Sequence, residues 1–215
     1  MAGARAARGG FVLEARRAGG EVESLAAGWV VNCAGLWADD VARLIDPACR
    51  ERIDPMRGEA AWFRRGARPG LDVARMNVYP TPRRVRLPGG EYWTVGVHLT
   101  PTLLPAGPEG GAARLSDVVS VGPLNFAARG KGDLAGEHRP MEEFRAQVAG
   151  YFPQLRAADL RPYQVGVQAR LAGRQDWHVA ADPNHRRWIN LLGIDSPGLT
   201  SCLALAEHVG GMLAA

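Results

Sequence analysis

One stretch near the C-terminus has the residue types and spacing of a site for a polar or anionic ligand. The residues LLGIDSPGLTSCLALAEHV run from an apolar segment through a Ser-Pro-Gly turn into small and apolar residues. Ser196 can cap a helix, Pro197 suits its first turn, and Gly198 lets a ligand approach the backbone. The first N–H groups of a helix lack partners inside it, so those of Gly198, Leu199 and Thr200 can face an acceptor. A well-capped helix without any ligand explains the same residues.

A second turn of this kind lies near the N-terminus. The residues VVNCAGLWADDV place Ala34 and Gly35 directly after an apolar segment. Small side chains at these two positions allow a ligand to lie against the backbone. Asp39 and Asp40 then favour the start of a helix, because acidic side chains stabilise its positive end. One such turn indicates little by itself, but two turns that flank a long insert favour a shared binding site.

Two α/β segments enclose a segment with the pattern of an antiparallel sheet. A strand at 29–33 leads into a helix near 36–45, and a strand near 187–194 leads into the last helix. Short apolar runs separated by proline and glycine fill the middle of the chain and are typical of strands, whereas 101–116 is expected to form a loop. The predicted fold class is therefore α/β (α+β). The expected domains are 1–50, 51–165 and 166–215.

The composition is that of an ordinary globular chain. It has 215 residues, of which 47% are hydrophobic and 22% charged, so a sizeable core can form. The net charge of +4 comes from scattered arginines, and the run at 83–86 lacks the pattern of a nucleic-acid site. We therefore expect no nucleic-acid partner, and the positive balance suits a small anionic substrate. No apolar run reaches the roughly 18 residues of a transmembrane segment.

The spacing of cysteines and histidines predicts no metal site. Cys33, Cys49 and Cys202 form no CxxC pair, and the apolar surroundings of Cys33 and Cys202 predict small core residues. Neither a G-x-S-x-G elbow nor a P-loop occurs, which argues against hydrolases and kinases. Free thiols favour a reducing compartment, so we expect a cytoplasmic protein. A mitochondrial one stays open, because MAGARAARGG resembles part of a transit peptide.

Short motifs in a fixed order resemble the D-amino-acid-oxidase-like flavoprotein superfamily. Within it the chain most resembles the L-2-hydroxyglutarate dehydrogenases and oxidases, from about Phe11 to the C-terminus. The resemblance implies FAD held without a covalent bond by a partial Rossmann-like layer, with an inserted antiparallel substrate domain. The motifs are VVNCAGLWADDVARL, RGE, VYPTP, VGVHLT, VGP and INLLGIDSPGLTSCLALAEHV.

The resemblance assigns both glycine turns to the cofactor. The AGL turn would lie along FAD. The SPGLT helix start would face the pyrimidine edge of the flavin and stabilise negative charge after reduction. The predicted cofactor-binding residues are Ala34, Gly35, Leu36, Gly193, Ser196, Pro197, Gly198, Leu199 and Thr200.

The resemblance also gives four candidate catalytic residues. His98 would take the hydroxyl proton as hydride leaves the substrate carbon for flavin N5, or it is a structural strand histidine. Tyr79 would orient the substrate, or it is a core tyrosine. The family commonly carries arginine where this chain has Gln168. Arg170, two residues further along a strand and on the same side, would hold a substrate carboxylate in its place.

Arg57 is predicted to have a structural role. It lies in the RGE motif, where it can pair with Glu59 or with a loop carbonyl. A substrate-facing position for this guanidinium is the alternative.

The resemblance leaves three functions open. The strand-GxGxxG-helix signature that receives the FAD pyrophosphate is not found, so the chain resembles a C-terminal portion and FAD binding is expected to be incomplete. The first hypothesis is a flavoenzyme, or a fragment of one, that oxidises the CH–OH of a small 2-hydroxy acid such as L-2-hydroxyglutarate. The second is an amino-acid (CH–NH) oxidase. The third is an inactive remnant, or half of a split enzyme whose companion chain carries the Rossmann half.

Overall fold

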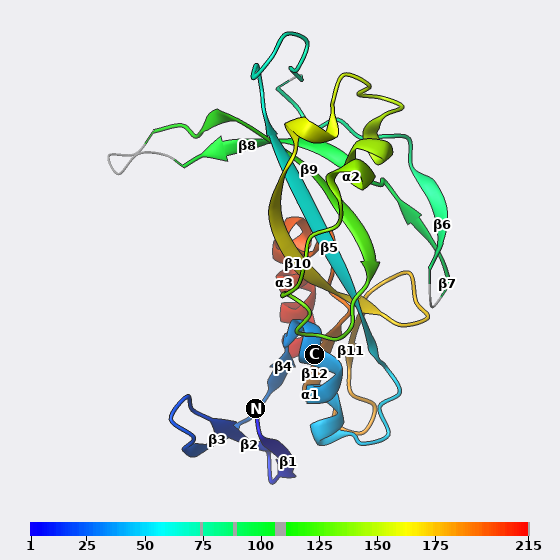
Figure 1. Cartoon of the computed structure of the whole chain (residues 1–215). Helices are drawn as coiled ribbons and strands as arrows, with labels where there is room; N and C mark the ends of the chain where they lie inside the picture. Colours follow the sequence, from blue (N-terminus) through cyan, green and yellow to red (C-terminus); the bar gives the residue numbers. More distant parts are fainter. Residues whose placement is uncertain (74, 88–89, 106–110, 215) are drawn as a thin grey trace. The chain divides into compact units, whose positions relative to one another are not determined.

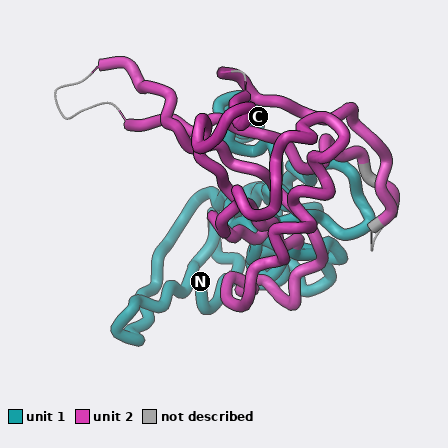
Figure 2. The backbone as a smooth tube through the Cα atoms, turned by 45° about the horizontal axis from the view of Figure 1, so that its top comes forward, with its two compact units in different colours: residues 1–55, 168–215 teal, residues 56–167 magenta. Residues whose placement is uncertain are grey.

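The chain divides into two compact units. The computed structural model describes residues 1–73, 75–87, 90–105 and 111–214. Unit 1 comprises residues 1–55 and 168–215, and unit 2 comprises residues 56–167 (Figure 2). The assignment of these units to a cofactor domain and a substrate domain stays a prediction.

Unit 1 contains a small mixed sheet with helices after two of its strands. β12 (Trp188–Leu192) runs parallel to β4 (Val30–Asn32) and antiparallel to β11 (His178–Ala181). The short helix η1 (Gly35–Trp37) and then α1 (Ala38–Ile45) follow β4.

The long helix of unit 1, α3 (Gly198–Ala214), follows β12. Its length is 17 residues, and the described residues include no helix that is long and apolar enough to cross a membrane. An antiparallel sheet completes the unit and consists of β1 (Gly3–Ala7), β2 (Gly10–Arg16) and β3 (Val22–Ala27).

Buried polar bonds hold the α/β layer of unit 1 together. Asn32 on β4 donates to Asn190 Oδ1 on β12 at 2.9 Å and to the carbonyl of Ala38 at 2.7 Å. Both asparagines are buried, so these bonds satisfy groups that would otherwise be desolvated without partners. Ala38 and Ala42 on α1 are fully buried, and their small side chains let the helix pack closely on the layer.

Unit 2 is built on an antiparallel sheet. The sheet order is β10–β5–β9–β8 (Figure 1). The first residues of β5 and the last residues of β10 belong to unit 1. The predicted α/β (α+β) class is confirmed, since unit 1 has parallel strands with helices and unit 2 has this sheet. The strands are β5 (Ile53–Arg64), β8 (His98–Leu104), β9 (Arg114–Ala127), β10 (Arg161–Leu171) and the separate hairpin β6 (Arg83–Leu87) and β7 (Gly90–Thr94).

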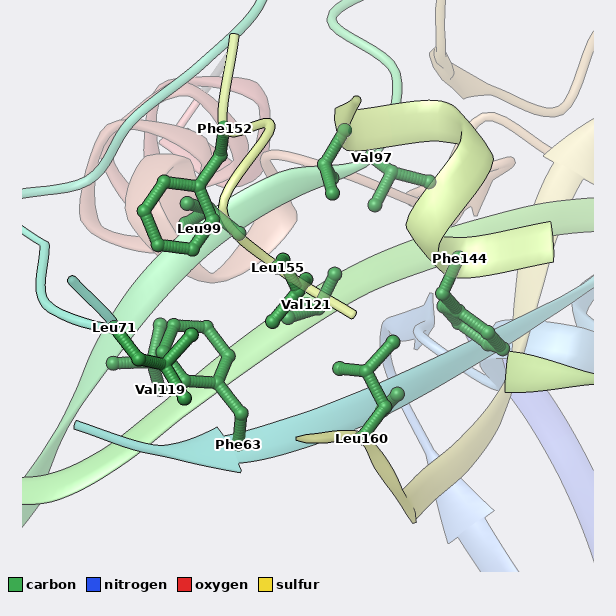
Figure 3. Close-up of a cluster of buried hydrophobic side chains, with 12 residues drawn as sticks. Phe63, Leu71, Val97, Leu99, Val119, Val121, Phe144, Phe152, Leu155 and Leu160 are labelled. Carbon is green, nitrogen blue, oxygen red and sulfur yellow. The ribbon is translucent and has the colours of Figure 1, made fainter. Parts of the chain in front are cut away.

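The core of unit 2 lies between this sheet and α2 (Met141–Val148). Phe63, Val119 and Phe144 are fully buried, and Figure 3 shows Phe63 and Phe152 directed toward the same cluster. The two phenylalanine rings stack with centroids 5.8 Å apart. A short helix, η2 (Ala157–Asp159), leads from this core into β10.

The predicted loop at 101–116 is wrong at both of its ends. β8 extends to Leu104, and β9 begins at Arg114. The two strands pair there, and the hydroxyls of Thr102 and Ser116 are 2.6 Å apart across the ladder. Pairing between β8 and β9 thus forms a strand structure despite the proline and glycine content of this segment. Residues 106–110 lie outside the described part of the chain.

A buried ionic cluster joins β5 to the segment 133–139 of unit 2. Arg57 Nε donates to Glu59 Oε1 at 2.8 Å, and Arg57 Nη1 donates to the carbonyls of Asp133 (2.9 Å) and Ala135 (2.8 Å). Arg57 is 3% exposed and Glu59 is 1% exposed. The second Glu59 oxygen accepts the N–H of Arg139 at 2.7 Å. The predicted pairing of Arg57 with Glu59 and a loop carbonyl is therefore confirmed.

Candidate functional site

An apolar cavity of about 560 Å³ lies in unit 1. It is lined by β4 and the turn after it, by the end of β12 and the turn after it, and by α3. The two glycine turns that were predicted to share a ligand site both reach this cavity. The lining residues from the two turns and their neighbours include Val31, Cys33, Gly35, Ile194, Gly198 and Cys202.

The parallel pairing of β4 and β12 explains why the two turns meet. Asn32 lies opposite Asn190 in the register, so both strands end at the same edge of the sheet. Ligands of open α/β sheets bind at the carboxyl ends of the strands, because the loops and helix starts gather there. The cavity occupies this position in unit 1.

Gly35 is the member of the AGL turn that lines the cavity. Its φ is +56°, which disfavours any other residue, and a Cβ built on it would meet no atom within 4 Å. The absent side chain thus keeps the cavity wall open. Ala34 and Leu36 are instead packed against a buried cluster around α1, so their side chains support the turn and do not line the cavity.

The start of α3 differs from the predicted arrangement in one bond. The N–H of Gly198 donates to the carbonyl of Asp195 at 2.7 Å, so the prediction that this N–H faces a ligand is wrong. In the described part of the chain, the N–H groups of Leu199 and Thr200 have no hydrogen-bond partner. These two groups remain as donors at the positive end of the helix. No capping bond from Ser196 is found among the described residues.

Most of α3 is uncovered although apolar residues predominate in its sequence. Val209 is the buried residue among those described in the helix, whereas Leu199 is 94% and Leu203 is 77% exposed. Leu203 therefore does not pack into the core of unit 1. Exposed apolar surface of this kind fits a ligand or another protein segment.

Two of the three cysteines lie at the cavity. The prediction that they are core residues is wrong. Cys33 and Cys202 are both exposed and line the cavity wall, from the turn after β4 and from α3. Partial desolvation raises the pKa of the Cys33 thiol above its ordinary value. Cys49 is half-buried against the cluster around α1 and does not line the cavity.

His98 and Tyr79 form a stacked pair in unit 2. Their ring centroids are 4.5 Å apart, with an angle of 31° between the planes. His98 Nδ1 lies 3.3 Å from the carbonyl of Gly96; when it donates there, Nε2 is left as a proton acceptor. Burial lowers the pKa of His98, which keeps the ring neutral near pH 7. Tyr79 is 49% exposed, so its alternative reading as a core residue is wrong.

Gln168 and Arg170 lie on one side of β10. They are half-buried, and they alternate with the buried Ala169 and Leu171, as strand geometry requires. Arg170 Nε lies 3.4 Å from Asp195 Oδ2 in the turn before α3. The candidate substrate residues of unit 1 are therefore connected to the candidate cofactor turn.

Two polar residues near this turn were missed. Asp195 Oδ1 accepts the indole N–H of Trp177 at 3.0 Å, in addition to its contact with Arg170. Asp195 could have been identified from the sequence, because it is an acidic residue directly before the Ser-Pro-Gly turn. Trp177 carried no comparable signal, because its partner lies 18 residues away.

A family model described as FAD dependent oxidoreductase (DAO) matches residues 2–212. The chain belongs to this family. The match confirms the resemblance predicted from the short motifs, and FAD is the cofactor of the family. No group of three His, Cys, Asp or Glu side chains that could hold a metal occurs in the ranges that the structure describes.

The chain is also similar to a protein of known identity. The mitochondrial L-2-hydroxyglutarate dehydrogenase of Arabidopsis thaliana is 29% identical over 194 residues, which is 84% of this chain and 36% of that protein. The chain thus spans about a third of that relative's length.

Two solved structures show the same fold. The L-α-glycerophosphate oxidase of Mycoplasma pneumoniae, with FAD bound, has a TM-score of 0.66 at 15% identity over 100% of this chain and 50% of its own. The glycine oxidase of Geobacillus kaustophilus has a TM-score of 0.61 at 16% identity, over 95% of this chain and 45% of its own.

The residues at the cavity fit the flavin ring of FAD. Cavities of about 300–1,000 Å³ hold small ligands and cofactors, and this one is within that range. Its apolar wall suits a planar aromatic ring, and Gly35 leaves space where a side chain would intrude. Leu199 and Thr200 do not line the cavity, but they directly follow Gly198, which does, so their N–H groups are the nearest candidate donors for the polar edge of such a ring.

Proposed function

We propose that this chain is part of an FAD-dependent oxidoreductase that oxidises the CH–OH group of a small anionic 2-hydroxy acid such as L-2-hydroxyglutarate. The meeting of the two glycine turns at one cavity carries the proposal, because it fits the cofactor of the family. The substrate class is supported by the Arabidopsis relative, whose name specifies L-2-hydroxyglutarate. FAD, when bound, supplies a hydride acceptor at N5 of its ring.

The residues of the two turns would bind and orient the cofactor. Gly35 leaves room for the ring, with Ala34 and Leu36 supporting that turn. The N–H groups of Leu199 and Thr200 would donate to the polar edge of the ring and would favour negative charge there. Gly193, Ser196, Pro197 and Gly198 shape the backbone that presents these donors.

The substrate would be handled by four side chains. His98 Nε2 accepts the proton of the substrate hydroxyl, because its Nδ1 is occupied at the Gly96 carbonyl and its lowered pKa leaves the ring unprotonated near pH 7. Tyr79 orients the substrate with its exposed ring, which stacks on His98. Arg170, with Gln168 beside it on β10, binds a carboxylate of the substrate.

A companion segment would complete the cofactor site. The exposed apolar face of α3 supports this, since Leu199 and Leu203 would be covered by another segment. This segment, on this polypeptide or on a second chain, would carry the Rossmann half that receives the FAD pyrophosphate. The free cysteines fit a reducing compartment, the cytoplasm or, as the name of the Arabidopsis relative suggests, the mitochondrion.

A second candidate function is oxidation of an amino acid at its CH–NH bond. The similarity of the fold to a glycine oxidase favours it. The two candidates differ in the substrate that reduces the flavin.

Anaerobic mixing with candidate substrates tests the proposal. The full chain is incubated with FAD, separated from free cofactor, and mixed without oxygen with L-2-hydroxyglutarate, D-2-hydroxyglutarate or glycine. Loss of the visible flavin absorbance with L-2-hydroxyglutarate alone is the expected result. Loss with glycine alone would establish the second candidate, and a chain that retains no FAD would indicate a remnant or half of a split enzyme.

A further inference from the structure

Asp195 connects three segments of unit 1. Its Oδ1 accepts the indole N–H of Trp177 at 3.0 Å, and its Oδ2 lies 3.4 Å from Arg170 Nε. Its carbonyl accepts the N–H of Gly198 at 2.7 Å, and its own N–H donates to the carbonyl of Gly193 at 2.8 Å. Every polar group of this residue is therefore bonded, and the partners come from β10, from the segment before β11 and from the turn itself.

These contacts are partly shielded from water. The side chain of Arg170 is 21% exposed and that of Asp195 is 15% exposed. An ion pair in this environment is screened less than a pair on the open surface, and hydrogen bonds to a charged group are stronger than neutral ones. The contacts of Asp195 thus favour one position of the turn, through the 3.0 Å bond from Trp177 and the longer 3.4 Å contact with Arg170.

The turn also contacts β10 at the level of the backbone. Gly193 has φ +74°, and a Cβ built on it would lie 2.7 Å from the Cβ of Leu171. Leu171 directly follows Arg170 on β10. The turn is thus held against β10 at two neighbouring positions, by close approach at Gly193 and by charge at Asp195.

The residues on either side of Asp195 form part of the cavity wall. Ile194 and Gly198 both line the cavity, and α3 begins at Gly198. A shift of Asp195 therefore moves this wall and the first turn of α3. The same shift also changes the orientation of Arg170, which shares its side of β10 with Gln168.

We propose that Asp195 is a positioning residue that couples the Gln168 and Arg170 side of β10 to the start of α3. This coupling requires no bound cofactor or substrate. Its functional meaning rests on the proposed function, in which β10 binds the substrate carboxylate and α3 faces the flavin. Asp195 would then fix the position of the substrate-binding residues relative to the flavin-binding turn.

A double-mutant cycle on the chain without cofactor tests the coupling. The variants are Asp195→Asn, Arg170→Met and the two combined. Glu51→Gln is the matched control, because it breaks the Glu51–Arg174 pair of unit 1 (2.6 Å) without a contact to the turn. Hydrogen exchange is measured at the amides of Gly198 and Ser201, which donate to Asp195 and Pro197. The NMR resonance of the Trp177 indole N–H shows whether its bond to residue 195, from the segment before β11, changes.

Each single variant is expected to speed amide exchange at the turn roughly tenfold, as the loss of one charge-assisted hydrogen bond predicts. The combined variant exchanges no faster than the singles, because both remove the same interaction. The Trp177 resonance moves in all three variants and stays in place in Glu51→Gln. Unchanged exchange in both single variants, or effects that simply add, would overturn the proposal.

FAD binding separates this proposal from the proposed function. When the unmodified chain binds FAD, Asp195→Asn is expected to weaken that binding roughly tenfold, in line with the opening of the turn. A chain that binds no FAD contradicts the proposed function, whereas the exchange measurements still decide whether Asp195 couples the two elements.

Discussion

Replacing His98 with asparagine is expected to lower the turnover of L-2-hydroxyglutarate by about 100- to 10,000-fold, the range for loss of a general base. An amide has a similar shape but cannot accept the hydroxyl proton. FAD binding is expected to stay unchanged, because the proposed cofactor residues belong to other elements. The measurement is the rate of flavin reduction in a single turnover. His208→Asn, at an exposed position on α3, is the matched control and is expected to retain full activity.

The pH profile gives an independent check on His98. The base must be neutral, and burial lowers the pKa of His98 below its ordinary value of 6.5. The value of kcat/KM should therefore stay high as the pH falls to 6.5 and decline only at lower pH, as the ring becomes protonated. A decline centred above pH 6.5, or an unchanged acid limb in His98→Asn, would show that another group titrates.

Replacing Arg57 with methionine is expected to lower the free energy of unfolding by about 3–5 kcal/mol, as for other broken buried ion pairs. The change leaves the carboxylate of Glu59 buried without its charged partner and removes the bonds to the carbonyls of Asp133 and Ala135. Urea unfolding, followed by the fluorescence of the tryptophans, measures the loss.

Arg64→Met is the matched control for the buried pair. Arg64 pairs with Asp117 at 2.6 Å, but the two side chains are 59% and 50% exposed. An exposed pair contributes at most about 1 kcal/mol, so the free energy of unfolding of this variant should stay close to that of the unmodified chain. Equal losses in the two variants would contradict the account of the buried cluster.

The meeting of the two turns could be predicted because it depends on local patterns. An apolar strand, a glycine turn and a helix recur at Gly35 and Gly198, and parallel pairing brings such turns to one edge. The pairing of Arg57 with Glu59 was also predictable, since the two residues lie two positions apart on one strand.

Features that depend on long-range contacts were not predictable in this way. The apolar composition of α3 predicts burial, yet Leu203 is 77% exposed, because composition does not say which face other segments cover. Cys33 and Cys202 were placed in the core for the same reason, although they line a cavity. The bond from Gly198 to Asp195 depends on the geometry of the turn, which the residue types alone do not specify.

Protection of the cysteines by FAD tests whether the cavity between the two glycine turns binds the flavin. Cys33 and Cys202 line the cavity, whereas Cys49 lies outside it and serves as an internal control. The full chain is alkylated with iodoacetamide with and without FAD, and the rate at each cysteine is measured by mass spectrometry. FAD is expected to slow the reaction of Cys33 and Cys202 and to leave that of Cys49 unchanged. Equal rates with and without FAD at all three thiols would contradict flavin binding at this cavity.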